Sequence, residues 1–401
     1  YLMRLIDREI IEKAAEKFET PLYLYDTDIL REEMARFRKA LGPDIGINYS
    51  MKANSFILET MAELADHIEV CSMGEFLICR KMGIAPSKLL ISGVLKKSAD
   101  LEQILEYGQG ESIYTAESMG QFEHLCRWSR EHRTHIRCYP RLTSGNQFGM
   151  DQETVRSLMR KAQDEPYLTV EGLHFFSGTM KRMIRKQTKE LKMLDQYLLS
   201  LEGEGLHVPL LEYGTGFAVS YFQKDKDDSI SGENLTAFAD LAKAMEWKGK
   251  ICIEMGRALS AMCGSYLTRV MDKKTSDGRG YLITDGGIHQ IGYDGQIKGM
   301  YEPWIRQIPD RKDEPLEWTV CGSLCTVNDI LVQSCRLSGI AEGDVLSFDQ
   351  AGAYCAMEGM SLFLSHELPQ VVLCSREEGF RSVRERMETF ELNSPERAER
   401  K

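Results

Sequence analysis

Short apolar runs alternate with amphipathic segments between residues 46 and 256 of the chain. Eight runs have the length and the Ile, Leu, Val and Tyr content of buried strands, namely 46–50, 68–71, 89–93, 112–115, 135–139, 168–176, 210–213 and 251–254. Each of the first seven is followed by a segment with helical spacing, such as 117–128, 154–162 or 186–201. This alternation predicts an α/β fold, a (β/α)8 TIM-like barrel. A doubly wound open sheet stays an alternative, because the pattern does not give the order of the strands.

The pattern changes after Arg257. Further strand-like runs follow without regular helices between them, at 266–270, 280–284, 318–320, 345–348 and 370–373. They predict an antiparallel β domain after the barrel. The aromatic run at 21–25 precedes the barrel and is expected to join this second domain. We therefore expect a barrel over residues 28–261, a β domain made of residues 1–27 and 262–390, and a disordered tail over 391–401.

Two local signals lie outside this regular pattern. Thr27 or Asp28 is predicted to cap a helix that begins near Ile29. The charge-rich segment from Ser375 predicts a surface helix ahead of the tail.

Composition narrows the classes of function. The 401-residue chain is 43% apolar, which is enough for a large core. Its formal net charge of −11 argues against nucleic acid or an anionic membrane as the main partner. No apolar run approaches the length that spans a bilayer, and the first residues do not resemble a signal peptide. Eleven scattered cysteines, none in a CxxC pair, predict free thiols in a reducing cytoplasm and no metal site.

A lysine stands where the first barrel strand is predicted to end. Lys52 lies within Tyr49–Asn54, and the segment after it has helical spacing. The strand-to-helix end of a β/α barrel is its catalytic rim. A lysine there can lose its proton and attack a carbonyl, so Lys52 is a Schiff-base candidate. The alternative is a solvated loop lysine, one of 50 Lys and Arg residues.

Glycine-bearing turns end the last two predicted barrel strands. Gly214-Thr215-Gly216 follows the seventh strand, and Gly256-Arg257 follows the eighth. Turns at these places hold phosphate in many barrels through backbone N–H groups, which glycine leaves accessible. Glycine also ends many strands that bind nothing.

A carboxylate ends the eighth strand. Glu254 follows an apolar run, so it needs a partner. The partner is either Arg257 or another side chain of the barrel, or it is the protonated ring nitrogen of pyridoxal 5'-phosphate (PLP). A Schiff-base lysine, a phosphate cradle and a carboxylate are together what PLP chemistry requires.

These residues lie in motifs that resemble those of a known family. Tyr49–Asn54 resembles the lysine motif of the alanine-racemase-fold (fold type III) PLP-dependent decarboxylases, which include diaminopimelate, ornithine and arginine decarboxylases. The resemblance extends over nearly the whole chain. Its further motifs follow in the family's order at 141–150, 172–179, 214–216, 254–257, 322–325 and 352–354.

The resemblance implies roles for individual residues. Lys52 would carry PLP as an aldimine, and Glu254 would pair with the pyridine nitrogen. Cys325 would come from a partner subunit and return a proton after carbon dioxide leaves, which implies a head-to-tail homodimer with shared active sites; the alternative is another buried thiol. The further cofactor contacts implied are Thr179, Gly214, Thr215, Gly216, Gly256, Arg257 and Tyr354. The substrate contacts implied are Arg257, Thr326 and Tyr301.

The chain departs from the family pattern in places. Phe176 stands where the family has a histidine stacked on the cofactor ring; a phenyl ring stacks but cannot hydrogen-bond. His174 either compensates, as a catalytic residue, or is a satisfied core histidine. Thr326 replaces an acidic residue, and no Arg-Pro precedes Tyr301. His289, in a loop of the β domain, is expected at the surface.

The predicted function is PLP-dependent decarboxylation of an amino acid or amino-acid derivative. Thr326 cannot neutralise a distal ammonium group, so a small substrate that is masked or tethered to a carrier protein at its distal end fits better than free diaminopimelate. The alternatives are diaminopimelate decarboxylase proper, an amino-acid racemase, and a catalytically silent homologue that binds partners.

Overall fold

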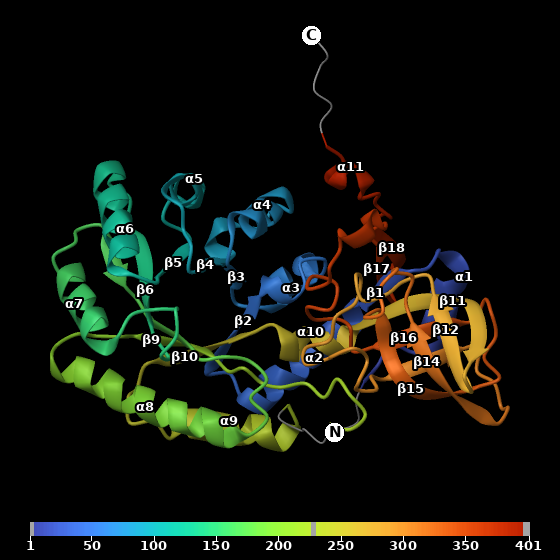
Figure 1. Cartoon of the computed structure of the whole chain (residues 1–401). Helices are drawn as coiled ribbons and strands as arrows, with labels where there is room; N and C mark the ends of the chain where they lie inside the picture. The colour runs from blue at the N-terminus through green and yellow to red at the C-terminus, as the bar shows by residue number, and fades with distance from the viewer. Residues whose placement is uncertain (1–3, 226–229, 396–401) are drawn as a thin grey trace, which may run out of the picture. The chain divides into compact units, whose positions relative to one another are not determined.

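The computed structural model describes residues 4–225 and 230–395. These residues form two compact units (Figure 1). The first unit contains the described residues between 31 and 219 and between 230 and 259. The second contains those between 4 and 30, between 220 and 225 and from 260 onward. None of the described helices is both long and apolar enough to cross a membrane.

The first unit is a closed barrel of parallel strands. Each strand pairs with the next in the order β2-β3-β4-β5-β6-β8-β9-β10, and β10 pairs with β2 to close the ring. These strands are β2 (Ile45–Ser50), β3 (Ile68–Val70), β4 (Leu89–Ile91), β5 (Ile113–Ala116), β6 (Ile136–Leu142), β8 (Leu173–Phe176), β9 (Leu210–Gly214) and β10 (Lys250–Met255). The closed ring confirms the predicted (β/α)8 barrel and excludes the open sheet.

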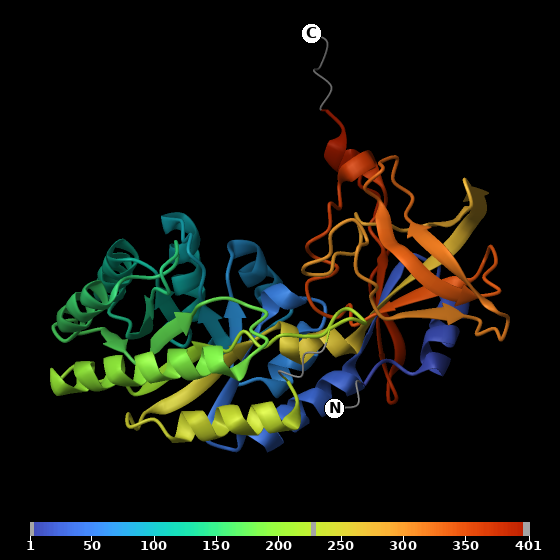
Figure 2. The same cartoon turned by 60° about the horizontal axis from the view of Figure 1, so that its bottom comes forward.

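Amphipathic helices surround the ring of strands (Figures 1 and 2). They are α2 (Thr27–Leu41), α3 (Leu58–Leu64), α4 (Met73–Lys81), α5 (Ser98–Gly108), α6 (Met119–His132), α7 (Gln152–Ala162), α8 (Ile184–Gly203) and α9 (Gly232–Lys243). Ser72, Ser118, Asp151 and Ser231 begin four of them, because each side chain accepts a hydrogen bond from the N–H three residues later. Local sequence therefore sets where these helices start.

The cap of α2 differs from the prediction. Asp26 Oδ1 accepts hydrogen bonds from the N–H groups of Asp28 and Ile29, at 2.9 and 3.3 Å. Thr27 and Asp28 were the predicted caps, and that prediction is wrong. Asp26 is the last residue of β1, so one carboxylate both ends the strand and begins the helix.

The apolar run at 168–176 is two strands rather than one. β7 (Leu168–Val170) pairs only with the start of β6, and β8 pairs with the end of β6 and with β9. Gly172 lies at the break. A Cβ there would be 3.0 Å from both the carbonyl oxygen of Leu210 and the ring of Tyr139. These close neighbours leave little space for a side chain at residue 172, which favours glycine. The hydrophobic pattern of the sequence does not show this break between the two strands.

The second unit is a nine-stranded sheet. Its strands are β1 (Leu22–Asp26), β11 (Gly264–Ser276), β12 (Arg279–Thr284), β13 (Ile305–Ile308), β14 (Pro315–Cys321), β15 (Ile330–Ser338), β16 (Val345–Asp349), β17 (Gln370–Ser375) and β18 (Gly379–Arg384). Most pairs are antiparallel, while β1–β17 and β12–β14 are parallel. The early strand β1 lies between β11 and β17 in this sheet. The helix α1 (Arg8–Lys17) precedes it.

The segment from Ser375, which was predicted to form a surface helix, begins with a strand, and its helix comes later and is short. Residues 379–384 form β18, which pairs antiparallel with β17. The short helix α11 (Phe390–Asn393) follows, and the predicted tail at 391–401 lies outside the described residues from 396 onward. β18 is an edge strand, and its exposed Arg381 discourages further pairing at this edge.

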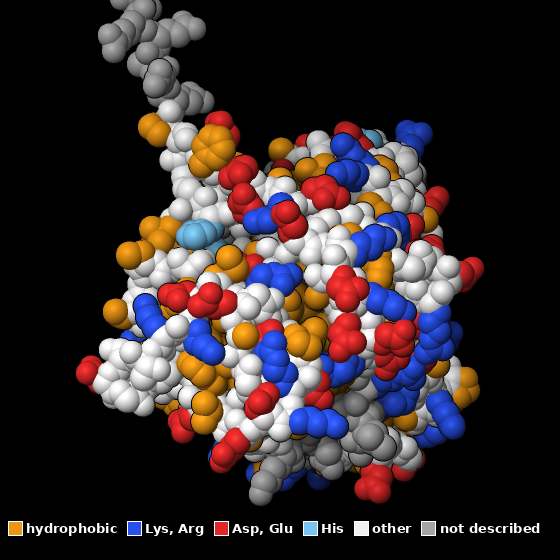
Figure 3. Space-filling view, turned by 90° about the vertical axis from the view of Figure 1, so that its right-hand side faces the viewer, with side chains coloured by type: hydrophobic (Ala, Val, Ile, Leu, Met, Phe, Trp, Pro, Cys, Tyr) orange, Lys and Arg blue, Asp and Glu red, His pale blue; other side chains and the backbone are white. Residues whose placement is uncertain are grey.

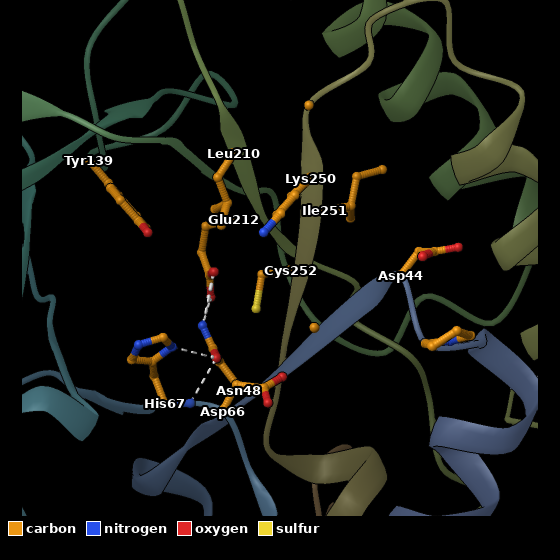
Figure 4. Close-up of a pocket in the computed structure, with 13 residues that line it drawn as sticks. Asp44, Asn48, Asp66, His67, Tyr139, Leu210, Glu212, Lys250, Ile251 and Cys252 are labelled. Carbon is orange, nitrogen blue, oxygen red and sulfur yellow. Dashed lines mark hydrogen bonds between the residues drawn. The ribbon is translucent and has the colours of Figure 1, made fainter.

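A cavity of about 580 Å³ lies at the N-terminal ends of the barrel strands (Figure 4). Inside it, the Asn48 amide donates hydrogen bonds to both carboxylate oxygens of Glu212, at 2.8 and 2.9 Å, and accepts one from the His67 N–H. Burial raises the pKa of Glu212 well above its usual value. This polar chain occupies the end of the barrel opposite the catalytic rim.

Candidate active site

The side chains at the C-terminal rim of the barrel converge on Lys52. β2 ends at Ser50, and Lys52 lies in the single 3-10 turn that follows, Met51–Ala53. Gly256, at the end of β10, packs against this turn, since a Cβ there would be 2.8 Å from the Cβ of Ala53. The first and last strands of the barrel therefore fix the position of the lysine together.

Two carboxylates face the lysine. The Nζ atom of Lys52 lies 3.0 Å from Glu69 Oε2 on β3 and 3.9 Å from Glu254 Oε1 on β10. Both carboxylate side chains are almost fully buried, whereas that of Lys52 is 36% exposed. Burial alone raises the pKa of Glu69, but the Lys52 ammonium, His174 and hydrogen bonds from Ser50 and Lys52 hold it well below its usual value. Glu69 is therefore an anion that fixes the lysine.

Glu254 is held by a second set of contacts. Ser50 Oγ donates to Glu254 Oε1 at 3.2 Å, and His174 Nε2 lies 3.0 Å from Glu254 Oε2. His174 is 1% exposed, and its Nδ1 has no hydrogen-bond partner among the described residues. With a proton on Nε2, His174 donates to the carboxylate and keeps it oriented. This contact gives His174 a polar partner and suits a positioning role, which differs from both roles predicted from the sequence.

Phe176 is the next inward-facing residue of β8 after His174. Lys52 Nζ lies 5.9 Å from the centre of its ring. The ring also fills the space next to Gly214, where a Cβ would be 2.2 Å from Phe176 Cδ2. The aromatic ring thus lies between the lysine and the glycine turn of β9.

The two glycine turns form one cradle with the loop after β8. Gly216 has a left-handed backbone (φ +60°), and a Cβ there would be 2.2 Å from the carbonyl oxygen of Gly178. Arg257 begins the short helix α10 (Arg257–Ser260), and its Nε donates to Thr179 Oγ1 at 3.4 Å. The Thr215 hydroxyl is buried and has no hydrogen-bond partner among the described residues. This geometry brings together residues from three strand ends that the sequence predicted as phosphate ligands.

Glu190 on α8 binds three side chains that lie next to the cradle. It accepts hydrogen bonds from Ser177 Oγ, from Lys181 Nζ at 2.7 Å and from the Tyr213 hydroxyl. The Lys181 N–H in turn donates to Gly216 O at 2.8 Å. Desolvation lowers the pKa of Lys181, while Glu190 opposes that shift. The buried pair fixes the glycine turn at the rim.

The remaining predicted site residues lie in the second unit. Cys325 is exposed, and Thr326 is half-buried in the same loop. Asp329 orders this loop, because its carboxylate accepts from the N–H groups of Ile288 and Leu324 at 2.8 and 2.7 Å. The loop thus presents Cys325 to solvent on a rigid support.

Tyr354, Tyr301 and His289 also belong to the second unit. Tyr354 has a left-handed backbone (φ +65°), and its carbonyl oxygen accepts from the N–H groups of the following turn. Tyr301 packs on Phe222, with 5.3 Å between ring centres. His289 was expected at the surface, and this is wrong: it is 1% exposed, and burial lowers its pKa to about 4.

Sequence reasoning missed Glu69 and the Lys181–Glu190 pair. The strand 68–71 was recognised, but nothing in its pattern singles out the carboxylate. A signal for Glu69 exists only in the barrel geometry, because its strand pairs with β2 and Glu69 lies opposite Ser50. Lys181 and Glu190 are nine residues apart, across a loop and two helical turns.

The chemistry of this rim matches a cofactor with an aldehyde, a basic ring nitrogen and a phosphate. Lys52 supplies an amine, and Glu254 supplies an oriented carboxylate. Gly216 allows the left-handed turn to pack directly against the carbonyl oxygen of Gly178, and Arg257 supplies a cation beside Thr179. PLP carries these three groups.

Comparison with known proteins agrees with this chemistry. Residues 27–261 match the family described as "Pyridoxal-dependent decarboxylase, pyridoxal binding domain". The chain is 27% identical over 398 residues to the L-glutamyl-[BtrI acyl-carrier protein] decarboxylase of Niallia circulans, with 92% of each chain covered. It is 24% identical over 366 residues to the diaminopimelate decarboxylase of Aquifex aeolicus, covering 86% of this chain and 84% of that one.

A solved structure shows the same fold. Diaminopimelate decarboxylase from Helicobacter pylori, complexed with L-lysine, superposes with a TM-score of 0.82 at 22% identity, covering 94% of this chain and 96% of that one.

A first prediction concerns which lysine carries the cofactor. Borohydride reduction of the PLP-loaded protein, followed by peptide mapping, should find the label on Lys52, because this amine opens onto the rim between two carboxylates. Lys181 is an internal control at the same rim, since its amine is buried against Glu190. Lys52→Ala should lose both label and turnover. Label on Lys181 or any other lysine would contradict the assignment.

A second prediction concerns Glu254. Glu254→Gln should still load PLP but lose turnover by about 10²-fold or more, because the amide cannot hold a proton on the ring nitrogen. Steady-state kinetics and the absorption spectrum of the loaded variant measure both effects. Ser50→Ala, which removes one hydrogen bond to Glu254 and keeps its charge, should lose less. Turnover close to wild type in a loaded Glu254→Gln protein would show that Glu254 is structural.

Proposed function

We propose that this chain, which belongs to the pyridoxal-dependent decarboxylase family, acts on an amino acid whose distal end is tethered to a carrier protein. The chain is a PLP-dependent carboxy-lyase. PLP, when bound, accepts the electron pair that remains when carbon dioxide leaves. What the proposal adds is the identity of the residues involved and the nature of the substrate.

The barrel residues hold and orient the cofactor in this proposal. Lys52 binds it covalently, and Glu254 holds a proton at the pyridine nitrogen. His174 and Ser50 keep the Glu254 carboxylate in position, and Phe176 covers one side of the ring. The phosphate ligands proposed from the barrel are Thr179, Gly214, Thr215, Gly216, Gly256 and Arg257. Tyr354 of the β domain is proposed as a further phosphate ligand, and Tyr301 and Thr326 as substrate contacts.

One observation carries the substrate proposal: Asp329 and Arg306, two charged residues near the substrate positions in the sequence, are already paired. Both oxygens of the Asp329 carboxylate accept backbone N–H groups, so Asp329 does not replace the acid missing at Thr326. Arg306 donates to both carboxylate oxygens of the buried Asp349. Recognition of a free distal ammonium and carboxylate would leave buried charges unpaired. A distal end without charges avoids this cost.

The relative from Niallia circulans supports the same substrate class, since its name gives a glutamyl group on an acyl-carrier protein. PLP-dependent decarboxylation removes the carboxyl group next to the amine. That carboxyl group must therefore be free, so the carrier must be joined through the side-chain carboxyl. For this chain we infer an acidic amino acid bound as a thioester or an amide at its distal carboxyl group.

Diaminopimelate decarboxylase proper is the second candidate. Lys298, which is exposed in a left-handed turn of the second unit, is the cation that favours it.

We also infer a cytoplasmic location, because all eleven cysteines, each within the described residues, carry free thiols. The cofactor-binding domain is proposed as residues 28–261, with the β domain in the flanking segments.

We further infer a head-to-tail homodimer in which Cys325 of one subunit returns the proton in the site of the other. Exposed apolar side chains of the second unit support this. Val327, next to this loop, is 89% exposed, and Phe363, Phe390 and Leu392 are 44%, 49% and 69% exposed. Figure 3 shows hydrophobic side chains on the segment that leads to the grey C-terminal residues. Apolar groups of this kind are commonly covered in an oligomer.

A third prediction tests the substrate. kcat/KM should be highest for a carrier-bound or amide-capped amino acid, and lower for free diaminopimelate, ornithine, lysine and arginine, because the free distal groups find no charged partners. Carbon dioxide release and product mass measure this. Free diaminopimelate turned over at about 10⁴ M⁻¹s⁻¹ or faster would overturn the proposal in favour of the second candidate.

A fourth prediction tests the shared site. Lys52→Ala mixed with Cys325→Ala should regain about one quarter of wild-type activity, because half of randomly paired dimers are mixed and each restores one of its two sites. Cys321→Ala, at the neighbouring cysteine, should remain active alone. If subunit exchange is confirmed by mass and activity does not return, both residues act within one subunit.

A further inference from the structure

α8 has two faces of opposite character. Its buried side is largely apolar, through Leu191, Leu194, Leu198 and Leu201. The exposed side of its first half carries Arg185, Lys186, Lys189 and Lys192, which the helical repeat places together, away from the buried leucines. Within 181–192 there are six Lys and Arg residues and one acid.

The single acid of this segment does not neutralise the exposed side. Glu190 is turned inward, where it accepts from Ser177, Lys181 and Tyr213. None of the four exposed cations of the stripe forms a hydrogen bond or an ion pair through its side chain with another described residue. We call Arg185, Lys186, Lys189 and Lys192 the α8 stripe.

The neighbouring helix shows the ordinary arrangement of surface charge. On α7, Arg156 and Arg160 bind Glu204 at 3.0 and 2.7 Å, and Lys161 binds Glu123 at 3.1 Å. In a chain with a net charge of −11, acids are available to pair with surface cations. The α8 stripe is therefore a local positive field on a negative protein.

The stripe begins at the catalytic rim. β8 ends at Phe176, the loop that follows carries the cradle residues Gly178 and Thr179, and α8 starts at Ile184. Arg185 is six positions after Thr179 in the chain. The distance between the two residues is therefore at most about 20 Å, even if the chain between them is fully extended. α8 lies on the outer side of the first unit, beside α9 (Figure 1).

We propose that the α8 stripe is the docking surface for an acidic carrier protein that delivers the tethered amino acid to Lys52. This inference rests on the proposed function. A carrier protein presents its acyl group on a phosphopantetheine arm, so an anionic phosphodiester lies at the attachment point beside the carrier's own carboxylates. An arm of this kind can bridge a span within the limit of about 20 Å set by the chain between Thr179 and Arg185.

Charge complementarity also explains why a stripe is needed. Two proteins that are both negative repel each other at a distance, and a local patch of opposite sign overcomes this during encounter. The patch acts within a Debye length of about 8–10 Å at ordinary ionic strength. A free amino acid brings no carrier protein that could bind the α8 stripe. The stripe therefore affects only a substrate that is tethered to a carrier.

The test compares two forms of one substrate. The probes are a glutamyl group bound through its side-chain carboxyl to the BtrI acyl-carrier protein, and the same group bound to free pantetheine. Arg185→Glu/Lys189→Glu cancels the net positive charge of the stripe, because two cations and two carboxylates remain, without touching Lys186, the neighbour that acts on Lys181. Lys39→Glu/Lys243→Glu makes the same change in charge at two exposed helix ends on the opposite end of the barrel.

The stripe variant should lose at least about tenfold in kcat/KM with the carrier-bound substrate, mainly through KM, and should keep wild-type kinetics with the pantetheine substrate. Its dependence on salt should be flatter than that of wild type. The control variant should match wild type with both. Unfolding midpoints for all proteins check that the variants fold.

Several results would overturn the proposal. The stripe is not the docking surface if the variant keeps wild-type kinetics with the carrier. It acts on the barrel itself if both substrates lose equally. The carrier body makes no contact if wild type does not distinguish the two probes. Binding of the stripe to duplex RNA or anionic vesicles without any carrier preference would assign it to another partner. Wild type inactive on both probes and active on free diaminopimelate would instead reject the proposed function.

Discussion

The rim depends on one lysine that lies between two buried carboxylates. Glu69 and Glu254 lie on β3 and β10, which flank β2, and Lys52 follows β2. A buried carboxylate left without a partner costs several kcal/mol, on the order of 3–5. Lys52, the proposed cofactor lysine, is therefore also the cation that stabilises these buried carboxylates in the folded barrel. In the proposed role of Glu254, a protonated ring nitrogen of the cofactor would supply a second positive charge beside it.

The barrel and much of its rim could be predicted because both follow from repetition. Strand and helix alternate with regular lengths, and all parallel strands of a barrel end at the same rim. A residue at or near the end of a strand, such as Lys52, Glu254 or Gly216, therefore has a known place before any contact is known. The resemblance to a family then added roles that position alone could not give.

The features that were not predicted depend on the pairing register of strands and on which strand lies at the edge of a sheet. Glu69 matters because it pairs opposite Ser50, and register is invisible in a three-residue strand. The segment 379–384 has charges at the spacing of a polar helix, yet it pairs with β17 as an edge strand. Asp329 could be taken for a substrate ligand until its carboxylate is seen to accept two backbone N–H groups. In each case a partner distant in sequence decides the outcome.

Phe176 shapes the rim without adding a group that can change its charge. The ring still packs on Gly214, where no side chain would fit. A phenyl ring, which cannot titrate, faces Lys52 at this side of the site. His174 remains, but its Nε2 is committed to Glu254, and it is too buried to meet solvent. Charge near the cofactor is then set by Lys52, Glu69, Glu254 and Arg257. Such a site favours a substrate that brings little charge of its own, which is the property of an amino acid with a tethered distal end.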